Sequence, residues 1–128
     1  MIDLSSNGLT QFPEGFKEFP CLKIIRLIHN DISSIPAEYF KDAKSVTENL
    51  QELTMNSNPL MELPSEIGDV CSSLRVLGLA YTELKTLPSS LAKLSKLKTL
   101  NVAGCNLQDP PQTLAERGAK AVKQHFSD

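Results

Sequence analysis

The residues able to perform acid–base or metal chemistry are few and scattered in this sequence of 128 residues. The two histidines, His29 and His125, lie far apart, and neither has the spacing of a metal site. A histidine beside a carboxylate can transfer protons, and the sequence allows His29 to pair with Glu52. No nucleophile with an activating partner completes such a site, so we expect a solvated histidine and no enzymatic activity.

The three cysteines and six glycines likewise form no recognised site. Cys21, Cys71 and Cys105 are isolated, without C-x-C or C-x-x-C spacing. The glycines are scattered and do not form a phosphate-binding loop. We therefore expect no cofactor and no metal.

The aliphatic residues follow a pattern that neither a regular helix nor a regular strand explains. In residues 74–88 the inward positions are held by Leu74, Leu77, Leu79, Leu84 and Leu87. A helix needs apolar residues at every third and fourth position, and a half-buried strand needs them at every second. The observed spacing predicts a short strand that turns sharply and returns, with all its leucines in one interior.

Versions of this pattern recur along the chain, at residues 1–13, 22–36, 50–64, 74–88 and 97–107. The steps between the last four copies are 28, 24 and 23 residues, counted from Leu22, Leu50, Leu74 and Leu97. A period of about 20 to 29 residues with the motif L-x-x-L-x-L-x-x-N/C-x-L is typical of leucine-rich repeats. The chain resembles a leucine-rich-repeat protein over essentially its whole length.

This resemblance implies an α/β solenoid that forms one domain over residues 1–128. A curved parallel sheet is expected on its concave side, with short helices and turns on its convex side. Leucines at motif positions one, four and six point inward. Positions three, five, seven and often eight point outward from the sheet, because successive side chains of a strand alternate between its faces.

The asparagine position of the motif predicts a structural ladder. Asn7, Asn30 and Asn58 occupy it in the first three copies, and their amides can satisfy backbone groups left open by the sharp turn. Thr82 and Cys105 replace asparagine in the last two copies. Both are short and donate weakly, so we expect the ladder to continue there with weaker bonds.

The segments that return the chain between strands predict short convex elements. Phe16 and Phe19 have helical spacing and are expected to pack into the core. Residues 37–44 favour a short helix. Ser89 and Ser90 follow a proline and are candidate helix N-caps.

The last copy departs from the pattern and predicts a C-terminal cap over residues 110–127. Asp109 replaces an inward leucine, and Pro110 and Pro111 then stop the strand and begin a helix. From Gln112 onward an amphipathic helix is expected. Its apolar face is formed by Leu114, Gly118, Ala121, Val122 and Phe126. The segment resembles the caps that end cytoplasmic leucine-rich-repeat domains.

The outward positions of the sheet supply the candidate binding residues. Ile24, Ile28 and Val76 are apolar, whereas Arg26 and Tyr81 belong to residue types that are enriched at binding hot spots. The predicted partner-binding residues are Ile24, Arg26, Ile28, His29, Glu52, Thr54, Asn56, Val76, Tyr81 and Asn101. The alternative is that neighbouring side chains or an oligomer contact cover Ile24 and Ile28.

Charge and family resemblance together favour binding of a protein. The net charge of −2 offers no electrostatic case for nucleic acid or an anionic membrane. Leucine-rich-repeat proteins bind protein partners on the concave surface, which predicts a non-enzymatic adaptor. The alternative is a regulatory segment of a larger enzyme, such as a kinase, GTPase or ubiquitin ligase.

The N-terminal copy begins in mid-motif at Ile2, without a polar cap. A solenoid end without a cap exposes an apolar face and an open strand edge. We expect a fragment of a longer chain, and the alternative is self-association through the Ile2–Leu4 edge.

Cysteine usage favours a cytoplasmic, intracellular protein. Extracellular leucine-rich-repeat proteins usually have disulfide-bonded caps, and no segment here resembles one. The first residues also lack the basic and apolar regions of a signal peptide. An odd number of isolated thiols is consistent with a reducing compartment.

Overall fold

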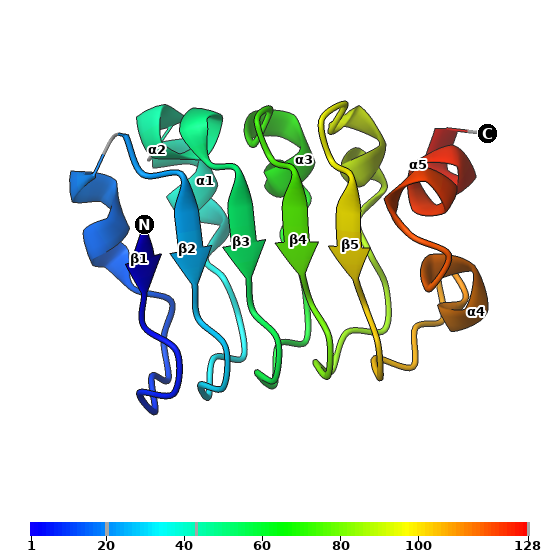
Figure 1. Cartoon of the computed structure of the whole chain (residues 1–128), viewed down its shortest axis with the longest axis horizontal. Coiled ribbons are helices and arrows are strands. Elements are labelled where there is room, and N and C mark those ends of the chain that lie inside the picture. Colours follow the sequence, from blue (N-terminus) through cyan, green and yellow to red (C-terminus); the bar gives the residue numbers. More distant parts are fainter. Residues whose placement is uncertain (20, 43, 128) are drawn as a thin grey trace.

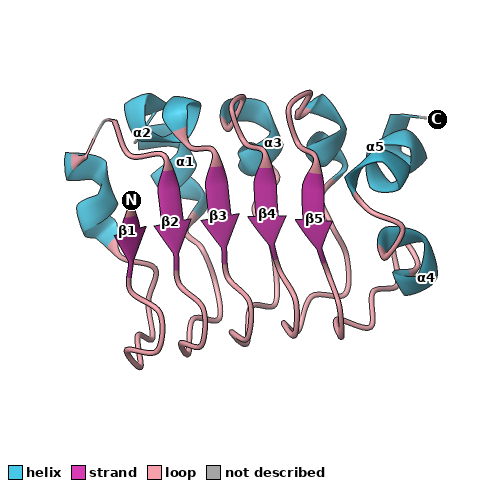
Figure 2. Ribbon diagram, viewed as in Figure 1, coloured by secondary structure: helices cyan, strands magenta, loops and turns pink. Residues whose placement is uncertain are grey.

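Five parallel strands form one sheet in the computed structural model, which describes residues 1–19, 21–42 and 44–127. The strands follow chain order across the sheet, as Figures 1 and 2 show. They are β1 (Ile2–Asp3), β2 (Ile24–Arg26), β3 (Glu52–Thr54), β4 (Val76–Gly78) and β5 (Thr99–Asn101). Each strand lies in a different copy of the sequence motif. The α/β leucine-rich-repeat solenoid is therefore confirmed.

Short helices cover the other face of the sheet (Figure 2). They are η1 (Glu14–Glu18), α1 (Ala37–Asp42), α2 (Lys44–Asn49), α3 (Glu66–Val70) and η2 (Ser89–Lys93). At the C-terminal end, α4 (Gln112–Ala115) and α5 (Ala119–Ser127) lie beside β5 (Figure 1). The expected helix over residues 37–44 is thus observed as α1 and the start of α2, and residue 43 lies outside the described residues.

The core lies between the sheet and the helices. The middle residues of the four longer strands are inward and buried: Ile25, Leu53, Leu77 and Leu100. Leucines of the turns stack on these, and aromatic rings close the first two copies, where Phe12 and Tyr39 meet edge to face at 5.0 Å between ring centroids. Each copy buries its apolar residues against its neighbours, as expected of a repeat fold.

The prediction for the two phenylalanines of the first return is correct for Phe16 and wrong for Phe19. Phe16 is buried, whereas Phe19 is 51% exposed. The helix η1 ends at Glu18, and Phe19 follows with a φ of −122°, outside helical geometry. Helical spacing therefore does not extend to Phe19, and its ring remains at the surface.

The asparagine ladder is confirmed for Asn30 and Asn58, whereas the exposed Asn7 amide donates to the Ser5 carbonyl of its own turn. The Asn58 amide donates to the carbonyls of Leu27 (2.8 Å) and Met55 (2.9 Å), and its Oδ1 accepts the Ile32 N–H at 3.1 Å. Asn30 similarly donates to the Leu4 carbonyl of the preceding turn at 3.1 Å. These amides therefore join consecutive turns.

The ladder weakens in the last two copies, as expected. Within the described chain, the Thr82 hydroxyl donates to the Leu79 carbonyl of its own turn (2.8 Å) and otherwise meets only the Cys105 thiol at 3.3 Å. The Cys105 thiol reaches the Leu79 carbonyl of the preceding turn at 2.9 Å. Neither side chain has the amide oxygen that accepts a backbone N–H in the earlier turns.

The predicted capping role of the two serines after Pro88 is wrong. The N-cap of η2 is Pro88 itself, with no side-chain capping bond. Ser90 is buried and donates instead to the Ser65 carbonyl of the preceding copy at 2.5 Å. The close contact between α3 and η2 brings that carbonyl within reach.

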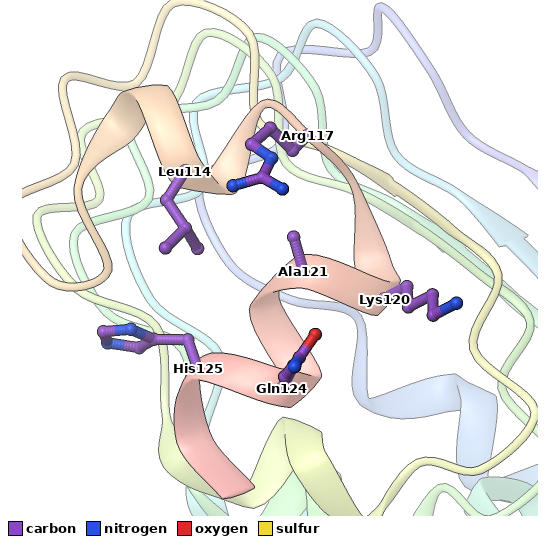
Figure 3. A pocket seen from close by; sticks show the side chains of 6 residues that line it. All are labelled: Leu114, Arg117, Lys120, Ala121, Gln124 and His125. Carbon is purple, nitrogen blue, oxygen red and sulfur yellow. The ribbon is translucent and has the colours of Figure 1, made fainter. Parts of the chain in front are cut away.

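The predicted single C-terminal helix is also wrong, because Gly118 breaks it into α4 and α5 (Figure 3). Gly118 has a φ of +107°, a conformation that favours glycine. The break turns Ala115, Ala119 and Val122 toward the core, where they are buried. Among the described residues, no helix has the length and apolar character needed to cross a lipid bilayer.

Candidate binding surface

The outward side chains of the strands and of the residues that follow them form a continuous surface, here called the sheet face. Because the strands are in register, its side chains line up in rows across the copies. One row contains Ile24, Glu52, Val76 and Thr99. The next contains Asp3, Arg26, Thr54, Gly78 and Asn101. Neighbours in a row lie on adjacent strands, about 4.8 Å apart.

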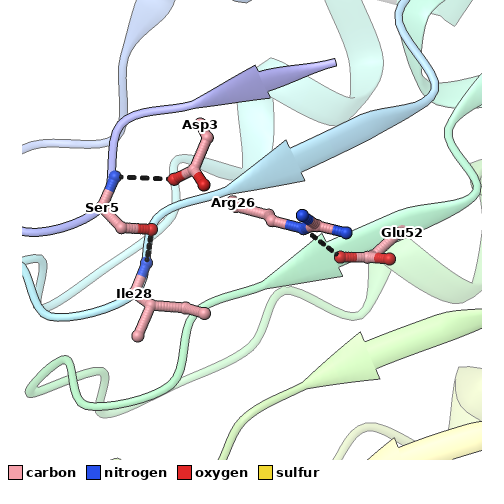
Figure 4. Close-up of polar contacts among 5 residues, drawn as sticks. All are labelled: Asp3, Ser5, Arg26, Ile28 and Glu52. Carbon is pink, nitrogen blue, oxygen red and sulfur yellow. Dashed lines mark hydrogen bonds and ion pairs between the residues drawn. The ribbon is translucent and has the colours of Figure 1, made fainter.

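Arg26 is held in place by charge-assisted contacts. Its Nε donates to Glu52 Oε2 at 2.7 Å, as Figure 4 shows, and this bond raises the pKa of the guanidinium. The side chains are 37% exposed for Arg26 and 18% for Glu52. The contact therefore orients the guanidinium at the surface, where its remaining N–H groups can reach a ligand.

The pairing of His29 with Glu52 that the sequence allows is absent among the described residues, and His29 is exposed, as expected of a solvated histidine. The register places Glu52 opposite Ile24, whereas the backbone N–H of His29 donates to the Asn56 carbonyl. Asn56, which lies beside His29, follows Glu52 by four residues in the chain. Arg26 is the closer partner because its long side chain reaches across to the next strand.

Polar side chains at motif position seven serve the backbone, a role that sequence reasoning missed. Ser5 Oγ accepts the Ile28 N–H at 3.0 Å (Figure 4), and Asn56 Oδ1 accepts the Ala80 N–H at 2.8 Å. Asp3 accepts the Ser5 N–H at 3.0 Å, and hydrogen bonding from Ser5 lowers the pKa of Asp3. The available signal was the short polar side chain at position seven in these two copies; the other copies have Ile28, Ala80 and Ala103 there.

Thr54, a predicted contact residue, is only 9% exposed and is not available to a partner. A Cβ placed on Gly78 would lie 2.9 Å from both Thr54 Cγ2 and Asn56 Oδ1. These two side chains therefore occupy the space that glycine leaves on the next strand. The missing side chain at Gly78 explains why Thr54 leans into the sheet rather than away from it.

Tyr81 is the most exposed of the predicted aromatic and apolar contact residues, at 66%. Its φ is +56°, and the equivalent residues Ser6, His29 and Ser57 have φ near +60° as well. The ring lies against Gly104, where an added Cβ would come within 2.5 Å of Tyr81 Cδ1. Backbone conformation and the neighbouring glycine therefore hold the ring at the rim of the sheet face.

The remaining predicted residues lie on the sheet face with different degrees of exposure. Ile24, Ile28 and Val76 are half-buried, whereas His29 and Asn101 are exposed. The half-buried residues leave apolar surface available around Arg26. Neighbouring side chains thus cover Ile24 and Ile28 in part, and the alternative of an oligomer contact stays a prediction.

The described part of the chain brings together no group of three or more metal-ligating side chains. Cys21 is exposed, while Cys71 and Cys105 are buried, and burial raises the pKa of the Cys71 thiol to about 12. A buried thiol that stays protonated is a poor nucleophile. The sheet face has the chemistry of a contact surface: apolar patches, an oriented guanidinium and an aromatic rim.

Comparisons with known proteins agree with this architecture. A family model described as leucine rich repeat matches residues 48–107. The leucine-rich repeat and calponin homology domain-containing protein of Drosophila melanogaster is 32% identical over 130 residues, covering 88% of this chain. Lumican of Gallus gallus is 34% identical over 90 residues, covering 69% of this chain.

The structural comparison gives the same result. A leucine-rich-repeat protein of Leptospira interrogans has a TM-score of 0.77 and 27% identity over 91% of this chain. The chain spans only 16% of the Drosophila protein, 24% of lumican and 28% of the Leptospira chain. Leucine-rich-repeat domains typically bind other proteins through the extended surface of the solenoid. Motif, fold and relatives together show that the chain belongs to the leucine-rich-repeat proteins.

Proposed function

We propose that this protein is a non-enzymatic adaptor that binds a protein partner on its sheet face. The observation that carries the proposal is the Arg26 guanidinium, oriented by Glu52 at 2.7 Å among half-buried apolar side chains. Arginine beside an apolar surface is a common arrangement at the centre of protein interfaces.

Rigidity of the sheet supports this function. Ile24, Arg26 and Ile28 lie on or next to a strand that is hydrogen-bonded to a neighbour on both sides. Such side chains lose little conformational entropy when a partner binds, which favours affinity. Tyr81 at the rim adds a large surface whose orientation the Gly104 contact restricts.

The proposal is tested by changing Ile24 and Ile28 to Ser and Arg26 to Glu in the full chain and comparing the recovered partners. We expect loss of at least one partner, with an affinity reduced by about 30-fold or more, since hot-spot substitutions cost about 2 kcal/mol or more. The control variant combines Met61→Ser and Lys85→Glu, both exposed and outside the strands. Unchanged recovery of every partner, with circular dichroism showing an intact fold, would refute the sheet face as the binding site.

A charge-swapped variant separates orientation from direct contact. Arg26→Glu with Glu52→Arg keeps an ion pair at these positions and reverses its direction on the surface. If Arg26 contacts the partner, the swap abolishes binding while thermal stability stays close to that of the wild type. Normal binding by the swapped variant would show that the pair only supports the sheet.

A second candidate function is that of a regulatory segment within a larger protein, such as a kinase, GTPase or ubiquitin ligase. The observation that favours it is that the chain covers only 16% of the Drosophila relative. The complete reading frame decides between the two functions. A catalytic domain in the same frame supports the regulatory segment, and a frame ending at residues 1 and 128 supports the adaptor.

Self-association through the edge of β1 is a further proposal. Met1 is 71% exposed and lies near the exposed Phe19 ring, in an open pocket that Ile2 also lines. Asp3 carries a charge on the same short strand, which disfavours edge pairing. Light scattering at several concentrations tests this proposal, and a strict monomer refutes it.

We also propose an intracellular location, supported by three unpaired thiols in the described chain, one of them exposed. Disulfides are rare in reducing compartments. Imaging of the tagged full-length protein in its native cells tests the location. Secretion of the tagged protein from the cells would contradict the proposal.

A further inference from the structure

The C-terminal cap contains a pocket that is separate from the sheet face. It is open and measures about 670 Å³. Its lining, drawn in Figure 3, consists of Leu114, Arg117, Lys120, Ala121, Gln124 and His125. All of these belong to α4, α5 or the short turn between them.

The helix break at Gly118 creates this pocket. In one continuous helix, residues 114, 117, 121 and 125 would form a flat stripe, because positions three and four apart share a face. Gly118 ends α4 with a φ of +107°, so α5 starts in a new direction and the stripe folds into a hollow. In Figure 3 Leu114, Ala121 and the Arg117 guanidinium face the space between the two helices.

The acidic groups nearest the pocket are already engaged. Gln112 Nε2 donates to Glu116 Oε1 at 2.8 Å, and His125 Nε2 lies 3.1 Å from Asp109 Oδ1. Lys123 donates to the Leu94 and Leu97 carbonyls and is directed toward the repeats. These contacts direct the two carboxylates to Gln112 and His125.

Arg117 and Lys120, by contrast, are exposed and have no ion-pair or side-chain hydrogen-bond partner among the described residues. They belong to the walls of the pocket, while the half-buried side chains of Leu114 and Ala121 supply its apolar surface. A guanidinium binds carboxylates with two parallel hydrogen bonds. The pocket therefore combines positive charge with a small apolar surface.

We propose that this pocket binds an acidic segment of a partner protein, with an apolar side chain on Leu114 and Ala121 and carboxylates on Arg117 and Lys120. Two cations on a chain of net charge −2 do not form the extended basic surface that nucleic acid requires. A small free anion would leave the apolar surface uncovered. The site is independent of the sheet face, so the protein has two distinct contact surfaces.

The proposal is tested by selecting binders from a displayed library of random 12-residue peptides against the full chain. We expect the enriched peptides to contain more Asp and Glu than Lys and Arg, together with Leu, Ile or Phe. Synthetic versions of these peptides are then measured against variants. Arg117→Glu with Lys120→Glu should weaken binding at least tenfold, and added salt should weaken it as well.

The matched control is Arg75→Glu with Lys96→Glu, which makes the same change in net charge at exposed positions outside the pocket. This variant should bind the peptides within about twofold of wild type, because neither residue lines the pocket and salt weakens the effect of exposed charges elsewhere on the surface. Circular dichroism and thermal unfolding confirm that both variants fold. The triple variant with Ile24→Ser, Arg26→Glu and Ile28→Ser should also retain binding.

Several outcomes overturn the proposal. They are enrichment of neutral or basic peptides, no enrichment at all, and equal binding by the Arg117→Glu, Lys120→Glu variant. Loss of binding only in the triple sheet-face variant would assign the peptides to the sheet face instead. Failure of the cap pocket therefore leaves the proposed function of the sheet face intact, and the two can be told apart.

Discussion

Individual asparagines stabilise this fold by joining neighbouring turns. Asn58 donates to the buried carbonyls of Leu27 and Met55 and accepts the Ile32 N–H. Two of these groups belong to the preceding copy, and the Leu27 carbonyl also accepts from Asn30. Buried backbone groups without partners cost about 1 to 3 kcal/mol each. The ladder is therefore part of the core, although its members are polar.

Replacement of Asn58 by Ala should reduce the free energy of unfolding by about 3 kcal/mol, since it leaves buried backbone groups unpaired. Urea unfolding measures the change. Asn7→Ala is the control, because Asn7 is exposed and its amide donates only to the Ser5 carbonyl. The control should cost less than about 0.5 kcal/mol, as exposed surface substitutions generally do. Equal losses in the two variants would contradict the ladder.

The helices α3 and η2 pack against each other at very short distance. Gly68 in α3 is buried, and a Cβ at this position would collide with the Ser90 backbone carbonyl of η2. The same approach lets the Ser90 hydroxyl reach the Ser65 carbonyl. Glycine is required here for close packing, because a Cβ would meet the Ser90 backbone, which cannot move aside as a flexible side chain can.

Gly68→Ala should therefore destabilise the protein by about 3 kcal/mol, at the upper end of the cost of overpacking. Gly15→Ala in η1 is the control, because an added Cβ there meets no atom within 4 Å. The control should be neutral or slightly stabilising, by up to about 1 kcal/mol. Thermal unfolding of the two variants checks this, and a stable Gly68→Ala protein would show that α3 and η2 can move apart without loss.

At the scale of the whole molecule, burial makes folding depend on pH in the alkaline range. Burial raises the pKa of the Cys71 thiol to about 12, above the ordinary value of 9.0, and burial also raises the pKa of Tyr39. The unfolded chain ionises these groups first. Their contribution to stability is complete below about pH 9 and declines as the pH rises toward 12, because only the unfolded state loses the protons.

The free energy of unfolding should thus decrease between pH 8 and pH 10.5, and Cys71→Ala should reduce that decrease by about 2 kcal/mol. Urea unfolding at both pH values measures the difference. Cys21→Ala, which removes an exposed thiol, should leave the pH dependence unchanged. A Cys71→Ala protein with the wild-type pH dependence would contradict the buried, protonated thiol.

Which residues face the core could be predicted from the repeat motif alone. Leu53, Leu77 and Leu100 are inward strand residues in the structure, and Asn30 and Asn58 form the ladder, all at the positions that the motif predicts. These features are local and repeat with the motif, because alternation along a strand decides the face to which each side chain points. The same rule placed Ile24 on the sheet face, whereas Tyr81, two residues after the inward Leu79, lies at the rim because its φ is +56°.

The contacts between side chains of different copies could not be predicted from the motif and became known from the folded chain. The 28-residue offset between β2 and β3 places Glu52 beside Ile24, within reach of Arg26 and away from His29. Thr54 is buried because the facing residue is Gly78, and the cap pocket exists because Gly118 breaks the final helix. These contacts depend on register and on the size of neighbours distant in sequence, which local periodicity does not encode.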